Sequence, residues 1–191
     1  MTKKALRAVI FIGFIFAFAG CAGVQVYSSD PAIQKVGNDY FEIEFEPELA
    51  AGYHFFNGFR FVVTNKTDKD LKIAWEETYY LFNERRYGRF VGGMILTEEG
   101  LDFEKYKELS RGLVVTIPAG QTKSQLLYPL KLIARQPMVD PYGRQPKSRG
   151  GAYSPGPIPA GKSGIEFVVR QNGKEKREKL NVHLTAHNYS K

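Results

Sequence analysis

The sequence predicts an all-β protein: an antiparallel β-sandwich of about seven to nine strands with one short helix and one long loop. Apolar and polar residues alternate with a period of two in several short runs, as half-buried strands require. Turn signals separate these runs at regular spacing, which is typical of sandwiches. A proline- and glycine-rich interval at 134–161 then interrupts the strands.

The clearest alternation begins after Tyr40. Its apolar and acidic positions are Phe41, Ile43 and Phe45 on one side, and Glu42, Glu44 and Glu46 on the other. We expect the apolar side chains to be buried, the glutamates to form a solvated face, and Pro47 to end the strand.

A hairpin is predicted next, from two alternating runs at 58–64 and 71–75 joined by a polar turn at 65–70. Trp75 is in phase with the apolar residues of the second run. We therefore expect its side chain to be buried, and its truncation to alanine to destabilise the domain.

Residues 78–82 and 85–91 predict another hairpin, with Asn83-Glu84 as its turn. The period of two is lost at 98–109, where large apolar residues recur every three positions among charged ones. This spacing predicts one short helix, with Thr97 as its N-cap.

The last strands are predicted at 112–117, 123–132, 165–170 and 179–186. Asn172-Gly173 separates the final two, and this pair supplies the positive φ angles that a type I′ hairpin turn requires. The strongest hairpin signal of the chain therefore lies near its C-terminal end.

The interval at 134–161 is predicted to be a long irregular loop, because prolines cannot pair within a central sheet. Long loops of this kind are usually functional or disordered. The loop is basic, and its cations are candidate binding residues: Arg135, Arg144, Lys147 and Arg149.

The N-terminal residues have the organisation of an export signal. A short basic segment precedes about twelve largely apolar residues at 8–19, and Phe18-Ala19-Gly20-Cys21 follows. This pattern resembles a bacterial lipoprotein signal, although Phe18 stands where Leu is commonest. The resemblance implies that Cys21, the only cysteine, is acylated with fatty acid such as palmitate and becomes the first residue of the mature chain.

The resulting organisation is a signal peptide at 1–20, a lipid-anchored tether at 21–38 and a β-sandwich domain at 39–191. Ala22 favours the outer membrane, facing the periplasm, in a Gram-negative cell. Two alternatives remain: a retained transmembrane anchor, which normally needs ~20 apolar residues, and a secretory signal with an incidental cysteine.

Charge and composition narrow the function classes. Residues 1–20 hold three basic residues and no acidic one, so their removal lowers the formal net charge from +7 to +4. That excess is too small to predict nucleic-acid binding. The 14 Phe and 11 Tyr can supply one sizeable core, which packing alone must hold because no cysteine remains for a disulfide.

One further resemblance concerns the fold. The run Phe61-Val62-Val63-Thr64-Asn65-Lys66-Thr67-Asp68-Lys69-Asp70-Leu71-Lys72-Ile73, with the later Ile117-Pro118-Ala119-Gly120-Gln121-Thr122, is similar to immunoglobulin-like domains of small bacterial lipoproteins. The similarity covers roughly residues 40–131. It implies an immunoglobulin-like sandwich and no known active site. The Cys-Trp-Cys core of antibody domains is absent.

Catalysis and metal binding find little support in the residue pattern. The sequence has no nucleophile elbow, phosphate loop or metalloprotease motif. On a strand, the adjacent carboxylates Glu76-Glu77 and Glu98-Glu99 would point to opposite faces. His183 and His187 would lie ~13 Å apart. We therefore expect neither an enzyme nor a cofactor nor a metal site.

Binding is the sharper hypothesis. Tyr79, Arg85, Tyr87 and Arg89 fall within twelve residues, and Tyr and Arg are enriched at binding hot spots. We expect Arg85, Tyr87 and Arg89 to point outward and Phe90 inward; the competing interpretation is an ordinary, partly exposed hairpin. The expected function is that of a lipid-anchored scaffold or accessory subunit for another envelope protein. The alternative is a module that binds an envelope polymer, glycan or lipopolysaccharide.

Overall fold

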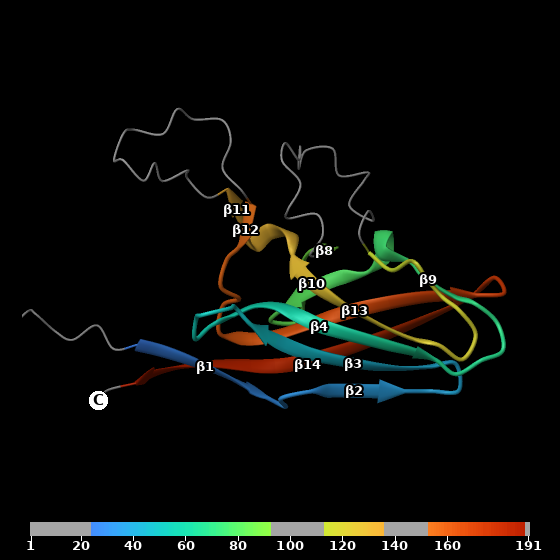
Figure 1. Ribbon diagram of the computed structural model, residues 1–191, viewed down its shortest axis with the longest axis horizontal. Helices are drawn as coiled ribbons and strands as arrows, with labels where there is room; N and C mark the ends of the chain where they lie inside the picture. The colour runs from blue at the N-terminus through green and yellow to red at the C-terminus, as the bar shows by residue number, and fades with distance from the viewer. Residues whose placement is uncertain (1–23, 93–112, 136–152, 190–191) are drawn as a thin grey trace, which may run out of the picture.

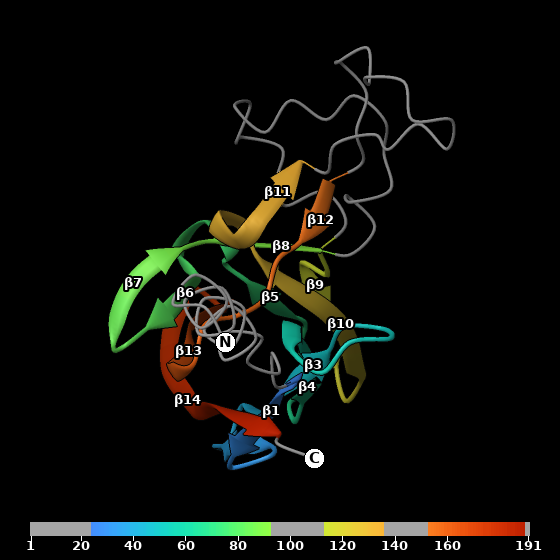
Figure 2. The ribbon, with the colours of Figure 1, turned by 90° about the vertical axis from the view of Figure 1, so that its left-hand side faces the viewer.

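The computed structural model describes residues 24–92, 113–135 and 153–189 and is shown in Figure 1. Every strand pair within these residues is antiparallel. Two sheets face one another around a common core in a sandwich-like arrangement (Figure 2). The predicted all-β, antiparallel class is therefore confirmed.

The larger sheet has seven strands, in the order β1-β14-β13-β5-β9, with β6 paired to β13 and β7 paired to β6. Its strands are β1 (Val24–Asp30), β5 (Leu71–Ile73), β6 (Tyr79–Phe82), β7 (Arg85–Gly88), β9 (Thr116–Ile117), β13 (Gly161–Gln171) and β14 (Lys174–Tyr189).

The second sheet has five strands in the order β2-β3-β4-β10-β8. They are β2 (Gln34–Gly37), β3 (Phe41–Leu49), β4 (Phe56–Asn65), β8 (Phe90–Gly92) and β10 (Thr122–Pro129). The smaller elements are a two-stranded sheet of β11 (Ile133–Arg135) and β12 (Tyr153–Pro155), and the 3-10 helices η1 (Trp75–Glu77) and η4 (Leu130–Leu132).

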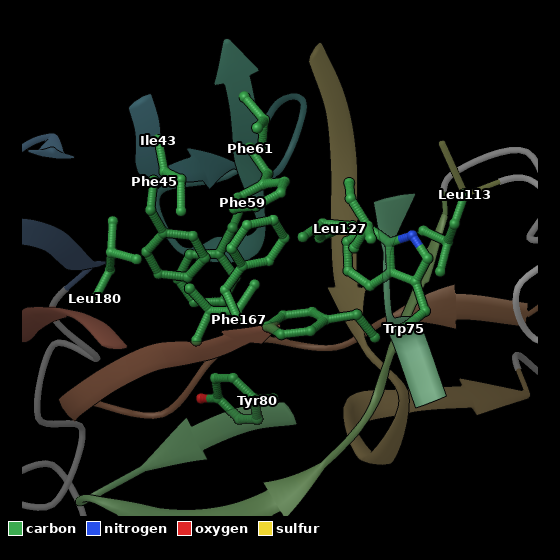
Figure 3. Packing of buried hydrophobic residues seen from close by; sticks show 14 of the residues in the cluster. Ile43, Phe45, Phe59, Phe61, Trp75, Tyr80, Leu113, Leu127, Phe167 and Leu180 are labelled. Carbon is green, nitrogen blue, oxygen red and sulfur yellow. The ribbon is translucent and has the colours of Figure 1, made fainter. Parts of the chain in front are cut away.

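The core lies between the two sheets and is rich in aromatic rings (Figure 3). Phe45 and Phe59 stack with ring centroids 4.4 Å apart. The ring centroid of Phe61 lies 4.9 Å from that of Phe167 in the opposite sheet. The predicted inward residues of β3 and β14 are all buried: Phe41, Ile43, Phe45, Leu180, Val182 and Leu184. Alternation along these strands was therefore read correctly.

Trp75 is buried as predicted, but its backbone is not a strand. β5 ends at Ile73, and Trp75 begins the 3-10 helix η1. Its ring contacts Phe61, and its Nε1 donates a hydrogen bond to the carbonyl of Val114 at 2.9 Å. This bond satisfies the one polar atom that burial of the indole would otherwise leave unpaired.

Asn65 joins the two segments on which the immunoglobulin-like resemblance was based. Its side-chain Nδ2 donates to the carbonyls of Lys69, Ile117 and Pro118, and its Oδ1 accepts from the backbone of Thr67. The polar turn after β4 and the proline turn before β10 are therefore held together by one buried side chain.

The predicted boundaries at Pro47 and at the tether are also wrong. Pro47 lies inside β3, opposite Phe59, rather than at its end. β2 pairs with β3 only as far as Phe45, so within the described residues β3 has no neighbouring strand on that side at Pro47. A missing N–H is tolerated at such an open edge. The expected tether is also folded from Val24 onward, because β1 and β2 belong to the two sheets.

The long loop is shorter than expected at both ends. Residues 133–135 and 153–155 pair as β11 and β12, and β13 already begins at Gly161. The helix expected at 98–109 and the signal peptide at 1–20 lie outside the described residues, as does the span 136–152.

Candidate binding surface on the β6–β7 hairpin

The β6–β7 hairpin is closed by the predicted two-residue turn. Asn83 and Glu84 have φ angles of 47° and 66°, and positive values at both positions are the signature of a type I′ turn. The Oδ1 of Asn83 accepts from the backbone N–H of Lys162 at 3.1 Å, while the Lys162 ammonium donates to Glu84 at 2.6 Å. The turn is thus fixed against the start of β13.

The hairpin does not alternate strictly. Tyr80 pairs with Gly88 but Leu81 pairs with Arg86, so the register shifts and Tyr87 is the additional residue. Arg85, Arg86 and Tyr87 are consequently all exposed. Arg85 and Arg89 point outward and Phe90 points inward, as predicted: both arginines are exposed, and Phe90 is only 2% exposed.

Arg86 lies flat against the sheet. Its Nε and Nη2 donate to the two carboxylate oxygens of Glu166 at 2.8 and 2.9 Å, and its guanidinium carbon lies 4.4 Å from the ring centroid of Tyr79. A second guanidinium, that of Arg177, donates to Glu166 at 3.0 Å. The hydrogen bonds from Arg86 lower the pKa of the Glu166 carboxyl to about 2, although burial opposes the shift.

This ion pair continues across the outer face of the seven-stranded sheet. Arg177 also donates to Glu175 at 3.0 Å and to Glu77 at 3.2 Å, and Arg170 donates to Glu76 at 2.8 Å and to Glu77. The expectation that Glu76 and Glu77 diverge is wrong, because η1 replaces the strand there and both carboxylates reach Arg170. These arginines are neutralised by carboxylates of their own domain.

The remaining cations lie beside two tyrosines on the two faces of the hairpin. Tyr79 and Tyr80 are successive on β6 and face opposite ways. Arg89 lies over Tyr79, whereas Tyr87 packs against Tyr80. Lys131 of η4 holds its ammonium 4.8 Å from the ring centroid of Tyr87, and the Arg89 guanidinium lies 5.7 Å from that of Tyr79. Arg85 and Arg89 form no ion pair with another residue of the described ranges. We name Tyr79, Arg85, Tyr87, Arg89 and Lys131, taken together across both faces of the hairpin, the Tyr/Arg patch.

Tyr87 has two roles within the patch. It is 38% exposed, yet its ring packs edge-on against Tyr80 at 6.0 Å and against Phe82 at 5.9 Å. One side of the ring thus rests on the hairpin, and Lys131 lies against it. The outward orientation expected for Tyr87 holds only in part.

Lys131 is the residue that sequence reasoning missed. It lies more than 40 positions after the hairpin and enters the patch through η4, where the Leu130 N–H donates to the Arg89 carbonyl at 2.9 Å. Gly88 gives its stem room, since a Cβ there would approach the Cγ of Lys131 to 3.3 Å. The glycine is the only local sign of this contact, and it does not identify the partner.

Of the four predicted binding residues of the long loop, only Arg135 lies within the described residues. Arg135 ends β11, which begins directly after η4, so its strand begins close to Lys131 in the chain. Arg144, Lys147 and Arg149 lie outside the described residues, and so does Cys21. The β11–β12 pair brings together the two ends of the interval that carries the three loop cations.

The histidines do not converge. His54, His183 and His187 are exposed, and the Nε2 of His187 lies 3.1 Å from the hydroxyl of Ser28. Within the described ranges, no three acidic, histidine or cysteine side chains gather in a way that could hold a metal ion. No helix in the same part of the chain has the length and apolarity needed to cross a membrane.

Comparison of the chain with protein-family models, with curated proteins and with solved structures found no match.

Proposed function

We propose that this chain is a lipid-anchored cell-envelope protein that acts by binding rather than catalysis. Its lipid is carried by Cys21, at the end of the small-residue site Ala19-Gly20. In a Gram-negative cell the protein faces the periplasm from the outer membrane. Its β-sandwich serves as a scaffold or accessory subunit for another envelope protein, which it contacts through the Tyr/Arg patch.

The contrast between two sets of arginines carries this proposal. Arg86, Arg170 and Arg177 are paired with carboxylates of the sheet or of η1, whereas Arg85 and Arg89 pair with none of the described carboxylates. The exposed guanidinium of Arg89 beside the half-buried ring of Tyr79 offers both a charge and an apolar face to a partner. The patch therefore has the composition of a binding hot spot, unlike the neutralised surface beside it.

A protein partner suits the patch because its side chains are partly held in place. Arg89 lies over Tyr79 and Lys131 lies over Tyr87, which limits the rotamers that each cation would lose on binding. Acidic side chains on the partner would complement the three cations. Tyr79 and Tyr87 would supply the apolar contact area.

An anionic envelope polymer is the second candidate. The same cations and rings could take phosphate or sugar faces, and the basic loop residues Arg135, Arg144, Lys147 and Arg149 would add to that attraction. Such binding should weaken strongly with salt, since it depends on exposed charges.

Two measurements test the proposal. Metabolic labelling with a fatty acid should mark the wild-type chain and leave Cys21→Ser unlabelled; equal labelling of both would disprove the anchor. The detergent-solubilised protein is then tested for stoichiometric capture of one envelope protein and for retention on purified lipopolysaccharide. Specific capture favours the scaffold, and salt-sensitive retention without a captured protein favours the polymer.

A further inference from the structure

The connection between β3 and β4 exposes apolar side chains. We call residues 49–55 (LAAGYHF) the β3–β4 tip; Leu49 is 51% exposed and Tyr53 is 62% exposed. The tip contains no Asp, Glu, Lys or Arg, although such residues make up 25% of the chain. What distinguishes the tip is that its uncharged residues include two large side chains, Leu49 and Tyr53, that are more than half exposed, as at an apolar contact.

The tip is a structured turn. The Ala50 N–H donates to the Phe55 carbonyl at 2.9 Å, and the Tyr53 N–H donates to the Ala50 carbonyl at 3.0 Å. Gly52 adopts a φ of 76°, which a residue with a side chain rarely takes. The rings of Tyr53 and Phe55 lie 5.0 Å apart. Leu49 and Tyr53 are therefore presented outward by a hydrogen-bonded turn.

The tip lies beside β1, the first strand of the described residues. The N–H of Tyr27 in β1 donates to the carbonyl of His54 at 2.9 Å, and the rings of Tyr27 and Phe56 are 6.4 Å apart. Figure 1 shows the β3–β4 connection at the same end of the sandwich as the beginning of β1. The polar turn after β4, which includes Asp68, lies at the other end of that strand.

Chain length then places this end close to the membrane. Three steps along the chain separate Cys21 from Val24, and three more separate Val24 from Tyr27. Each step spans at most ~3.6 Å, so a lipid on Cys21 would lie within ~22 Å of the Tyr27–His54 contact. A tether this short keeps the tip within ~22 Å of the anchor, near enough for it to reach the lipid headgroups.

We infer that the β3–β4 tip is a second membrane contact, in which Leu49 and Tyr53 enter the interfacial layer of the bilayer that holds the Cys21 lipid. This inference rests on the proposed lipid anchor. Tyr suits the headgroup region because its ring is apolar and its hydroxyl stays hydrated, and the tip carries no charge to desolvate. Two contacts would also orient the domain, with the Asn172-Gly173 turn pointing away from the bilayer.

The test uses the lipidated full-length protein in phosphatidylethanolamine–phosphatidylglycerol vesicles. In the anchored protein the sulfur of Cys21 carries the lipid, so Ala51→Cys supplies the only free thiol for an environment-sensitive dye. Asp68→Cys, an exposed position at the opposite end of β4, is the matched control. Nitroxide-labelled lipid in the vesicles should quench the dye at position 51 several times more strongly than the dye at position 68.

Replacing Leu49 and Tyr53 with serine should abolish this difference while the protein stays on the vesicles. Equal quenching at both positions, in protein whose lipid is confirmed by mass, would overturn the inference and leave the proposed function intact. A blue-shifted dye at position 51 that lipid nitroxide does not quench would also overturn it, because the tip would then contact protein. Absence of lipid on Cys21 would instead refute the anchor and, with it, the premise of the inference.

Discussion

Arg86 and Glu166 form an ion pair with two hydrogen bonds, 2.8 and 2.9 Å long, across the outer face of the seven-stranded sheet. The Glu166 side chain is 5% exposed, whereas that of Arg86 is 51% exposed. The pair explains why the middle arginine of the hairpin is committed to its own domain. Arg85 and Arg89, on either side of it, form no ion pair with another described residue.

Glu166→Gln should lower the free energy of unfolding by about 2 kcal/mol, because Arg86 and Arg177 lose a charged acceptor that the sheet has largely desolvated. Glu42→Gln is the matched control: Glu42 is exposed on β3, and its loss should change stability by less than ~0.5 kcal/mol. Urea unfolding of the three proteins measures both values. Equal stability of the two variants would show that the pair contributes nothing.

Acid should weaken the domain through the same carboxyl. The pKa of Glu166 is lowered from 4.5 to about 2, so folding favours its ionised form. The resulting stabilisation is fully present above pH 4.5 and is lost as the pH falls toward 2. Melting temperatures measured between pH 6 and pH 2 should fall less steeply for Glu166→Gln than for the wild type. Parallel curves would contradict this assignment.

Trp75→Ala should cost ~3–5 kcal/mol, as expected for a large buried ring. Trp75→Phe keeps much of the ring but leaves the carbonyl of Val114 without its donor, and should cost ~1–2 kcal/mol. Denaturant unfolding followed by circular dichroism gives both values without relying on the fluorescence of the residue replaced. A loss below about 1 kcal/mol for Trp75→Ala would mean that the indole does not belong to the core.

Tyr87→Ala should destabilise the domain by ~1–2 kcal/mol, since its ring packs edge-on against Tyr80 and Phe82. Arg85→Ala should change stability by less than ~0.5 kcal/mol. Thermal unfolding of the single variants separates the two roles. Should Tyr87→Ala prove neutral, the ring belongs to the binding surface alone.

The sequence predicted those parts of the fold that depend on local chemistry. Alternation at Phe41, Ile43 and Phe45 identified a half-buried strand, and Asn172-Gly173 identified a turn whose φ angles are 51° and 72°. Both features can be predicted locally, because the side-chain period of a strand and the positive φ angles of a turn depend only on residues adjacent in the sequence. The turn at Asn83-Glu84 was predicted for a similar reason.

Features decided by distant partners were not predictable. β1 forms only because β14 supplies a full antiparallel partner, so a segment such as 24–30 looks like a linker in isolation. The interior position of Pro47 depends on where β2 stops pairing. The split of 85–91 between two sheets is equally non-local, since β8 pairs with β10 and not with β6.

In the candidate site too, local features were predictable from the sequence and contacts with distant residues were not. The cluster of Tyr and Arg was visible in the sequence, but the separation of Arg86 from Arg85 and Arg89 required Glu166, which lies 80 positions away from Arg86. Lys131 required the contact of η4 with β7. Composition therefore locates the cluster, and tertiary contacts decide which of its cations pair with a described carboxylate.

We propose above all that Arg85 and Arg89 bind an envelope partner. The direct measurement is stoichiometric capture by full-length Arg85→Ala/Arg89→Ala protein, compared with a Lys72→Ala/Lys123→Ala control. The control removes the same charge from exposed positions on β5 and β10, away from the hairpin. We predict a loss of at least about tenfold in affinity for the arginine variant, equivalent to ~1.4 kcal/mol, with unchanged melting temperature and with normal capture by the control. Capture by the arginine variant at the level of the control would contradict the account.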